Sequence, residues 1–231
     1  MLQKFKQLKL KRRPKSSFSR RRAIEYKNSL KEVNMALDDL KSGKFIIVSD
    51  DKNRENEGDL IIPSDKVTPD HITFMVNHGT GIICCSLEEK RAQELQLPLM
   101  VPDKNNSEKH SCAFTISTDY KIGTTTGVSS HDRYLTIHNL NPASNATYTD
   151  FSRPGHVFPL IARDGGLFER QGHTEASIEL AKLSGSSPSG CLCELVNKNG
   201  TMSRYPDLVK FSNKYNIRMI TIKQIMIYLR D

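Results

Sequence analysis

The stretch KFIIVSDDKNRENEGDLII, residues 44–62, places a dense acidic segment between two apolar runs. Four consecutive apolar residues at 45–48 predict a buried strand, and apolar sequence returns at 61–62. Between the runs, five carboxylates fall within ten residues, together with one arginine and one glycine: Asp50, Asp51, Glu55, Glu57 and Asp59, with Arg54 and Gly58. A solvated turn needs only one or two such charges. The stretch therefore predicts a buried strand that delivers an acidic loop.

Three of these carboxylates, Glu55, Glu57 and Asp59, stand two residues apart, so extended backbone would point all of them to one face. Gly58 is expected to let the chain bend tightly between them. Carboxylates gathered in this way repel one another unless a cation lies among them, and hard oxygen ligands suit Mg²⁺ or Mn²⁺. A plain acidic surface loop is the alternative interpretation of this stretch taken alone.

Length and composition predict a globular chain of cytoplasmic type. The 231 residues, 37% hydrophobic and 26% charged, are enough for one good-sized domain or two small ones. No apolar run approaches the roughly 18 residues of a membrane-spanning helix, so no membrane partner is expected. The cysteines form no CxxC pair and follow no secretory signal, which favours free thiols in a reducing compartment.

The net charge of +8 comes from one end of the chain. Residues 1–22 hold ten Lys or Arg and no acid, which leaves 24 basic and 26 acidic residues elsewhere. Such a run predicts a disordered basic extension. It contains no groove-binding motif, so no nucleic-acid partner is expected. Organellar targeting by this basic segment is the other alternative, although Pro14 and the many lysines argue against it.

Helical and strand patterns alternate along residues 23–231, which predicts a single α+β or mixed α/β domain with a mixed sheet flanked by helices. Helices are expected at 23–42, 69–78, 86–95, 130–140, 174–184, 205–216 and 223–230, and strands at 44–50, 81–86, 112–118, 156–162, 190–196 and 217–222. Thr68 and Ser130 are the expected helix caps, the helix at 174–184 is expected to start near Thr174, and Gly43 is an expected helix end. Residues 164–166 are expected to join the strand at 156–162 to residues 166–170 in a hairpin.

Three further positions carry candidate chemistry. His156 follows a Pro-Gly pair at the start of an expected strand, where a structural hydrogen bond is the alternative role. Arg170, His173 and Thr174 precede a helix, and an arginine, a hydroxyl and helix N–H groups together suit a phosphate. Plain N-capping by Thr174 is the competing interpretation. Glu194 lies in an apolar strand, where an unpaired charge is costly, so it is a candidate base.

These residues together indicate a small phosphorylated substrate held at one end by its phosphate and at the other by a divalent ion. Such a site suits enolisation of a sugar phosphate, because the ion stabilises the developing negative charge. No glycine-rich nucleotide loop and no activated serine or cysteine nucleophile is present in the sequence. Taken without any relative, the residues predict a metal-dependent sugar-phosphate enzyme.

Four long motifs give a more specific indication. DDKNRENEGDL (50–60), TTTGVSSHDR (124–133), RPGHVFPLIARDGG (153–166) and QGHTEASIELAKLSG (171–185) occur in this order. The chain from about Ala23 onward thereby resembles 3,4-dihydroxy-2-butanone 4-phosphate synthase of riboflavin biosynthesis. Because the sequence ends with IMIYLRD, it is similar to the monofunctional form, and no fused GTP cyclohydrolase II domain is expected.

The resemblance implies a lyase that converts D-ribulose 5-phosphate into L-3,4-dihydroxy-2-butanone 4-phosphate and formate. It implies enolisation, loss of a hydroxyl, a skeletal shift and release of C4. The implied cofactor is Mg²⁺, with Mn²⁺ as an alternative and room for two divalent ions per site. The implied assembly is a homodimer with sites near the subunit interface.

The resemblance also implies roles for particular residues. Substrate binding is implied for Arg54, Glu55, Asp59, Arg170, Gln171, Gly172, His173, Thr174 and Glu194. The implied metal ligands are Glu55 and His173, with Glu57 a weaker candidate, and the implied catalytic residues are His156 and Glu194. Gln171 stands where relatives often carry a small or basic residue, which leaves the role of its side chain open.

Two alternative functions remain at this stage. The same clusters would serve another metal-dependent pentose-phosphate isomerase or lyase, which formate release would distinguish from the synthase. The other alternative is nucleic-acid binding through residues 1–22, with an inert domain behind them.

Overall fold

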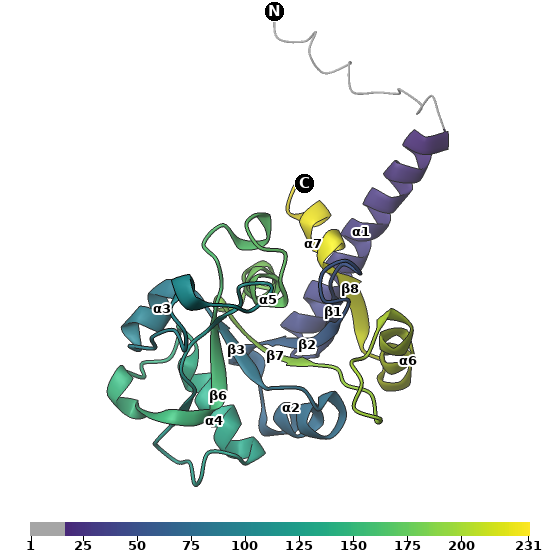
Figure 1. Cartoon of the computed structure of the whole chain (residues 1–231). Helices are drawn as coiled ribbons and strands as arrows, with labels where there is room; N and C mark the ends of the chain where they lie inside the picture. Colours follow the sequence, from purple (N-terminus) through teal and green to yellow (C-terminus); the bar gives the residue numbers. More distant parts are fainter. Residues whose placement is uncertain (1–16) are drawn as a thin grey trace, which may run out of the picture.

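A mixed eight-stranded sheet with helices on both faces forms the domain, which confirms the predicted fold class (Figure 1). The computed structural model describes residues 17–231, so most of the basic segment at 1–22 lies outside the described residues. The strand order is β4-β6-β3-β7-β2-β1-β8, and β5 pairs with β6 beside this path. Parallel pairs, β3 with β6 and β1 with β8, mix with antiparallel ones.

The secondary structure follows the predicted alternation of helices and strands. The strands are β1 (Ile46–Ser49), β2 (Gly58–Pro63), β3 (Cys84–Leu87), β4 (Ala113–Phe114), β5 (Thr118–Tyr120), β6 (Phe151–Ile161), β7 (Ser189–Glu194) and β8 (Arg218–Thr221). The α-helices are α1 (Ser17–Lys41), α2 (Pro69–Phe74), α3 (Glu89–Glu94), α4 (Ser130–Leu140), α5 (His173–Leu183), α6 (Tyr205–Tyr215) and α7 (Ile222–Tyr228).

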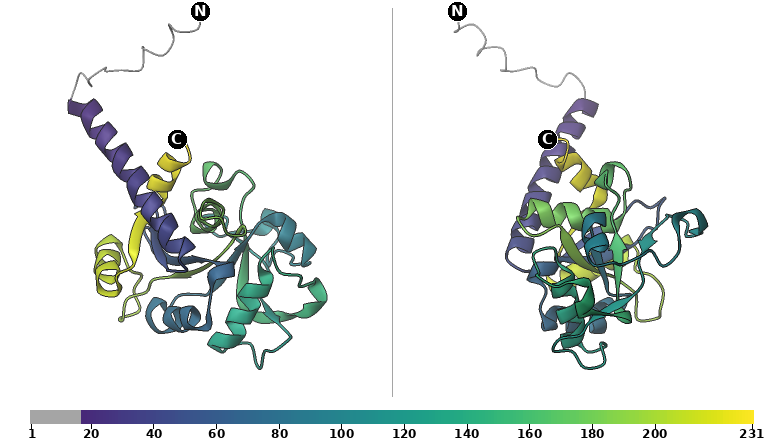
Figure 2. Two further views of the ribbon diagram at one scale, coloured as in Figure 1. Left: turned by 180° about the vertical axis from the view of Figure 1, so that it is seen from behind. Right: turned by 90° about the vertical axis from the view of Figure 1, so that its left-hand side faces the viewer.

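The two faces of the sheet carry separate hydrophobic cores. Alternate strand residues such as Ile47 and Cys191 pack with α2 and α4, and the residues between them, such as Ile61 and Leu192, pack with α1, α5 and α7. Figures 1 and 2 show these two groups of helices on opposite sides of the sheet. The central strands are buried on both faces, which explains why their sequences read as continuous apolar runs.

Helix α1 begins at Ser17, six residues before the helix start predicted at Ala23. Lys and Arg are good helix formers, and no proline follows Pro14 in this stretch. Residues 21–28 are exposed, and the fully buried face of the helix includes Val33 and Leu40. The predicted end is confirmed, because Gly43 takes a φ of 74° just after the helix.

The acidic loop bends at Asn56, not at Gly58 as the sequence suggested. Asn56 has a φ of 56°, a left-handed conformation that asparagine tolerates better than most residues. Gly58 instead lies within β2, opposite Ser49. An added Cβ at Gly58 would come within 2.5 Å of the Leu208 side chain, so this glycine permits packing against α6.

Three further local expectations are wrong. The expected hairpin at 164–166 does not form, because residues 166–168 make a 3-10 turn whose Leu167 is fully buried in the core beneath α5. The strand expected at 112–118 is divided into β4 and β5, which both pair with the long β6. The cap of α4 is Ser129, one residue before the expected Ser130, and its side chain accepts the Asp132 N–H.

Within residues 17–231, no helix combines the length and the apolar character needed to cross a membrane.

The fold makes the core face of α1, rather than its first turns, important for stability. We expect Leu40→Ala to lower the free energy of unfolding by about 2–5 kcal/mol, because Leu40 is fully buried. A variant lacking residues 1–22 should melt within about 2 °C of the full chain in circular dichroism. A loss of more than about 5 °C in that variant would show that these residues pack against the domain.

Candidate active site

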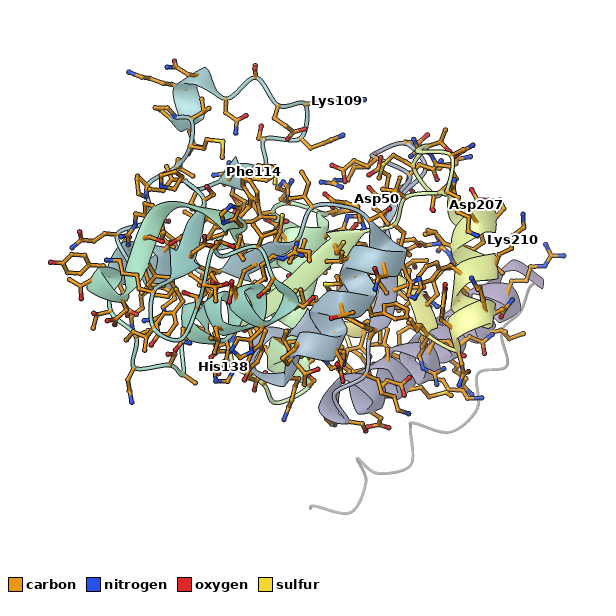
Figure 3. The ribbon with its side chains drawn as sticks, turned by 90° about the horizontal axis from the view of Figure 1, so that it is seen from below. Asp50, Lys109, Phe114, His138, Asp207 and Lys210 are labelled. Atoms are coloured by element: carbon orange, nitrogen blue, oxygen red, sulfur yellow. The ribbon has the colours of Figure 1, made fainter. Side chains whose placement is uncertain are left out.

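A pocket of about 180 Å³ opens beside the acidic loop, on the face of the sheet that α5 covers. Strand register forms its floor, because Asp59 of β2 lies opposite Val48 of β1 on one side and Glu194 of β7 on the other. Figure 3 shows Asp50 and Lys109 on the same side of the molecule, near the acidic loop and the loop before β4. The pocket is lined by Arg54, Glu55, Glu57, Asp59, Cys84, Glu108, Cys112, Phe114, Leu160, Arg170, His173, Thr174, Leu192 and Glu194.

Asp50 organises the acidic loop from inside. Its fully buried carboxylate accepts the backbone N–H groups of Glu55 at 3.0 Å and Glu57 at 2.9 Å. Arg54 donates to the same carboxylate at 2.9 Å and also contacts Glu55. With its oxygens engaged in this way, Asp50 holds Glu55 in place and leaves the Glu55 carboxylate facing the pocket.

Arg204, just before α6, holds the loop from outside. Its guanidinium donates to the carbonyl oxygens of Glu55 at 2.6 Å and Asn56 at 2.9 Å, and lies 3.5 Å from the Glu57 carboxylate. Sequence reasoning missed Arg204 because it lies 149 positions from Glu55. No local pattern connects two such distant segments.

His173, the first residue of α5, presents one ring nitrogen to the carboxylates. Its Nε2 lies 3.1 Å from the Val48 carbonyl oxygen, which can only accept, so Nε2 carries the hydrogen. Nδ1 then faces Glu55 Oε2 and Asp59 Oδ1, each at 3.7 Å. These gaps exceed a hydrogen bond and suit a cation that is shared by all three groups.

The crowded charges shift the pKa values of the three groups in different directions. Burial raises the pKa of Asp59 to about 7, and the neighbouring carboxylates add to this effect against the charge of His173. Burial works to lower the pKa of His173, but Asp59, Glu55 and Asp50 outweigh it and raise the pKa to about 9. Burial also opposes ionisation of Glu55, yet contacts with His173 and Arg54 lower its pKa to about 2.

The donor atoms fit a divalent ion. Ligand atoms of Asp50, Glu55 and His173 lie within 4.8 Å of one another. Among the described residues, Asp59 Oδ1 is buried without a hydrogen-bond partner, although it points at this cluster. Carboxylate oxygens with one imidazole nitrogen are a donor set that suits Mg²⁺ or Mn²⁺. Because the Asp50 oxygens are already engaged, Glu55 and His173 are the better ligands.

Arg170 and Thr174, which also line the pocket, form the candidate anion site. Gly172 is the N-cap of α5 and no side chain caps this helix, so the competing interpretation of Thr174 as a plain N-cap is wrong. Arg170 is fixed by Glu175 at 2.7 Å and by the His110 carbonyl at 2.9 Å. An added Cβ at Gly172 would lie 2.2 Å from the Arg170 guanidinium, so glycine allows this arginine to reach the helix start.

Glu194 ends β7 with its carboxylate in the pocket. One of its oxygens accepts the Ile82 N–H at 2.8 Å. Burial raises the pKa of Glu194, and the backbone hydrogen bonds offset this rise only in part. A carboxyl group with a raised pKa beside Asp59 is suited to exchange protons with a bound molecule.

Three of the site residues expected from the sequence, Gln171, Gly172 and His156, do not line this pocket. Gln171 is exposed on the surface before α5. His156 lies on β6, where its Nδ1 is 2.6 Å from Asp119 Oδ2 and its side chain is 48% exposed. The structure therefore brings the other expected polar side chains together in the pocket and leaves His156 outside it within one chain.

The pocket also contains residues that sequence reasoning did not assign, namely Glu108, Cys84 and Cys112. Burial raises the pKa of both thiols, so neither thiol is an activated nucleophile. A larger depression of about 710 Å³ lies between α2 and α6, but its lining does not include the acidic and histidine cluster. The acidic pocket therefore remains the candidate active site.

In this α/β domain, carboxylates and a histidine that can hold a divalent ion lie beside a candidate anion site. These features are typical of metal-assisted enzymes that act on small anionic substrates. The chain belongs to the 3,4-dihydroxy-2-butanone 4-phosphate synthase family, whose model matches residues 34–228. This match confirms the resemblance found in the four sequence motifs.

Individual relatives support the assignment to this family. A crystal structure of 3,4-dihydroxy-2-butanone 4-phosphate synthase in complex with two magnesium ions is 37% identical, with a TM-score of 0.81 over 85% of this chain and 95% of that one. The Candida albicans synthase structure is 43% identical, with a TM-score of 0.76 over 85% of this chain and 96% of that one. The riboflavin biosynthesis protein RibBA of Bacillus cereus is 50% identical over 199 residues, 86% of this chain and 49% of that protein. The chain thus spans about half the length of the curated relatives it matches.

The raised pKa of His173 predicts how metal binding depends on pH. A proton held with a pKa of about 9 must leave Nδ1 before a metal can bind, so protons compete with the metal below that pH. We expect Mn²⁺ affinity, measured by electron paramagnetic resonance, to increase between pH 6.5 and 9 by up to about tenfold per unit.

His138→Asn is a matched control for this prediction, because His138 lies on the exposed face of α4, away from Asp50 in Figure 3. This variant should keep the wild-type slope. His173→Gln should bind Mn²⁺ weakly with little pH dependence above pH 7. A flat wild-type profile would contradict the ligand role of His173.

Proposed function

We propose that this chain converts D-ribulose 5-phosphate into L-3,4-dihydroxy-2-butanone 4-phosphate and formate, a step of riboflavin biosynthesis, with Mg²⁺ or Mn²⁺ as cofactor. The observation that carries the proposal is the convergence of Glu55, Asp59, His173 and Glu194 in one pocket of a chain that belongs to this family. All five cysteines are free, which agrees with a cytoplasmic location.

Binding of the substrate uses the two ends of the pocket. Arg170, Thr174 and the N–H groups at the start of α5 would hold the phosphate, because a helix N-terminus and a guanidinium both favour a dianion. Arg54 and the unpartnered Oδ1 of Asp59 would contact the sugar oxygens at the acidic end. The substrate would therefore span the pocket with its carbonyl near Glu55 and His173.

Glu55 and His173 would hold the divalent ion, and the Glu57 carboxylate lies beside them for a second ion. When bound, the ion supplies Lewis-acid stabilisation of the negative charge that develops on the substrate oxygens. Arg54 lowers the repulsion among the loop carboxylates and keeps Glu55 ionised for this task.

Glu194 and His156 would move the protons. Enolisation removes a proton next to the carbonyl, and loss of a hydroxyl requires a proton to be delivered to it. Glu194 is suited to this exchange because burial raises its pKa toward neutrality while it faces the pocket. Asp59 lies opposite Glu194 in the sheet, and burial together with the charge of Glu194 raises the pKa of Asp59 to about 7, against the charge of His173.

A homodimer would bring His156 to the reaction. In one chain, His156 is half exposed outside the pocket, and Val128, which follows the Gly127 that lies against the His156 ring, is an exposed apolar residue. An interface between two copies would cover such residues and could place the His156 of one copy at the pocket of the other. This arrangement agrees with sites near the subunit interface, as the sequence resemblance implied.

Formate release tests the reaction itself. Purified protein with ribulose 5-phosphate and Mg²⁺ should release one formate per substrate, and EDTA should abolish the activity. Glu194→Gln should lower kcat by at least about 10²-fold, and Glu55→Gln should lose most turnover through loss of the ion. Glu89→Gln on the exposed start of α3 is a matched control that should leave kcat unchanged. Turnover without formate would instead indicate an isomerase.

Mixed dimers test whether His156 acts across the interface. His156→Asn and Glu194→Gln should each be inactive as pure homodimers. When the two variants are mixed and allowed to exchange subunits, one site of each mixed dimer regains both wild-type residues. Activity should then return to about a quarter of the wild-type value, since half of the dimers are mixed and each has one complete site. No recovery after verified exchange would show that His156 does not act across the interface.

A further inference from the structure

We propose that Asp119 is a positioning residue that fixes the tautomer of His156, so that Nε2, and not Nδ1, exchanges a proton with the substrate. This inference rests on the proposed catalytic role of His156. Asp119 lies on β5, and neither the sequence motifs nor the pocket lining assigned it a role.

Both oxygens of the Asp119 carboxylate face His156. Oδ1 accepts the His156 backbone N–H at 2.8 Å, and Oδ2 lies 2.6 Å from the ring Nδ1. An ionised carboxylate can only accept hydrogen bonds, so Nδ1 must be the protonated nitrogen. In a neutral imidazole, the other nitrogen, Nε2, is then the basic one. The two-point contact therefore fixes both the tautomer and the orientation of the ring.

The backbone around Asp119 and His156 allows β5 and β6 to approach each other closely. The register of β5 and β6 is irregular between Thr118 and Asp119, and the Asp119 carboxylate lies at the Nδ1 edge of the His156 ring. An added Cβ at Gly155 would lie 2.1 Å from the Thr118 carbonyl carbon, so only glycine lets the two strands approach this closely. The Ser152 hydroxyl donates to the Asp119 carbonyl at 3.2 Å and adds a further tie between the strands.

Gly127 packs against the contact between the Asp119 carboxylate and the His156 ring. Its φ of 92° suits glycine, and an added Cβ would lie 2.0 Å from Asp119 Oδ2 and 2.6 Å from His156 Nδ1. The buried carboxylate of Asp132 holds this loop by accepting the Gly127 N–H at 3.0 Å and the Thr125 hydroxyl at 2.7 Å. The loop therefore shields the Asp119–His156 contact, and the half-exposed ring can offer only Nε2 to a bound molecule.

This arrangement defines the proton transfers. Nε2 accepts a proton from the substrate, and the electron pair of the broken bond stays on the substrate. The ring becomes an imidazolium, whose positive charge the Asp119 carboxylate stabilises without taking the proton itself. Nε2–H later delivers the same proton to the departing hydroxyl, which leaves as water. Each proton enters and leaves through Nε2, so the Nδ1–H bond to Asp119 persists throughout.

The tautomer is measured directly by ¹⁵N nuclear magnetic resonance on the full chain labelled at histidine, with the His156 signals assigned from the His156→Asn spectrum. In the wild type, Nδ1 should show the shift of a protonated ring nitrogen and Nε2 that of an unprotonated one. In Asp119→Asn, the carboxamide can donate as well as accept, so the two shifts should move toward a mixture of tautomers. An unprotonated Nδ1 in the wild type, or unchanged shifts in Asp119→Asn, would overturn the proposal.

Kinetics provide the second readout. Asp119→Asn should lower kcat by about 10²-fold, while KM for ribulose 5-phosphate and the Mn²⁺ affinity stay within about threefold, because Asp119 touches neither. Asp150→Asn is the matched control: Asp150 is a carboxylate just before β6 that accepts the Thr147 N–H at 2.7 Å. It should leave kcat and the His156 shifts unchanged. An equal loss of kcat in both variants would overturn the positioning role.

The proposed reaction and the proposed role of Asp119 are tested by separate measurements. Absence of formate from the wild-type protein would contradict the proposed reaction, whereas the resonance measurement needs no turnover and tests the Asp119–His156 contact in either case.

Discussion

The cross-strand pairing of Asp59 with Glu194 is the constraint on which the site depends. The antiparallel register of β2 and β7 sets two carboxyl groups opposite each other in a buried position, and the turn after β1 adds Glu55. Like charges in this arrangement oppose folding unless protons, a histidine or a cation intervene. Burial, with the neighbouring carboxylates, raises the pKa of Asp59, and the carboxylates outweigh burial and raise the pKa of His173. The same geometry would accept a divalent ion in place of these protons.

The surrounding structure keeps these charges together. Asp50 binds the loop backbone from within, Arg204 binds its carbonyl groups from outside, and Gly58 allows α6 to pack closely enough for Arg204 to reach. Burying a charge-rich loop is costly, and each of these contacts offsets part of that cost by satisfying a polar group. A rigid loop also keeps Glu55 and His173 at a separation suited to one ion, which a flexible loop would not do.

The proposed catalytic groups lie on two separate parts of the fold. Glu194, Glu55 and His173 belong to the central strands and α5, whereas His156 is held by Asp119 and Gly127 beside β5 and α4. The second part does not line the pocket of the same chain. In the proposed homodimer, two copies would combine one part of each kind at a single site, so activity would depend on assembly.

The sequence by itself determined the helices and strands whose signals are local. Thr68 accepts the His71 N–H at the start of α2, Gly43 takes the left-handed conformation after α1, and continuous apolar runs form the central strands. It also located the acidic loop and His173, because charge crowding is visible without a structure. Only the tertiary structure decided which strand lies beside which, and hence that Asp59 meets Glu194, that Arg204 holds the loop and that Asp119 holds His156. Those contacts join segments far apart in the chain, and their pairing follows from burial and sheet register rather than from any local pattern.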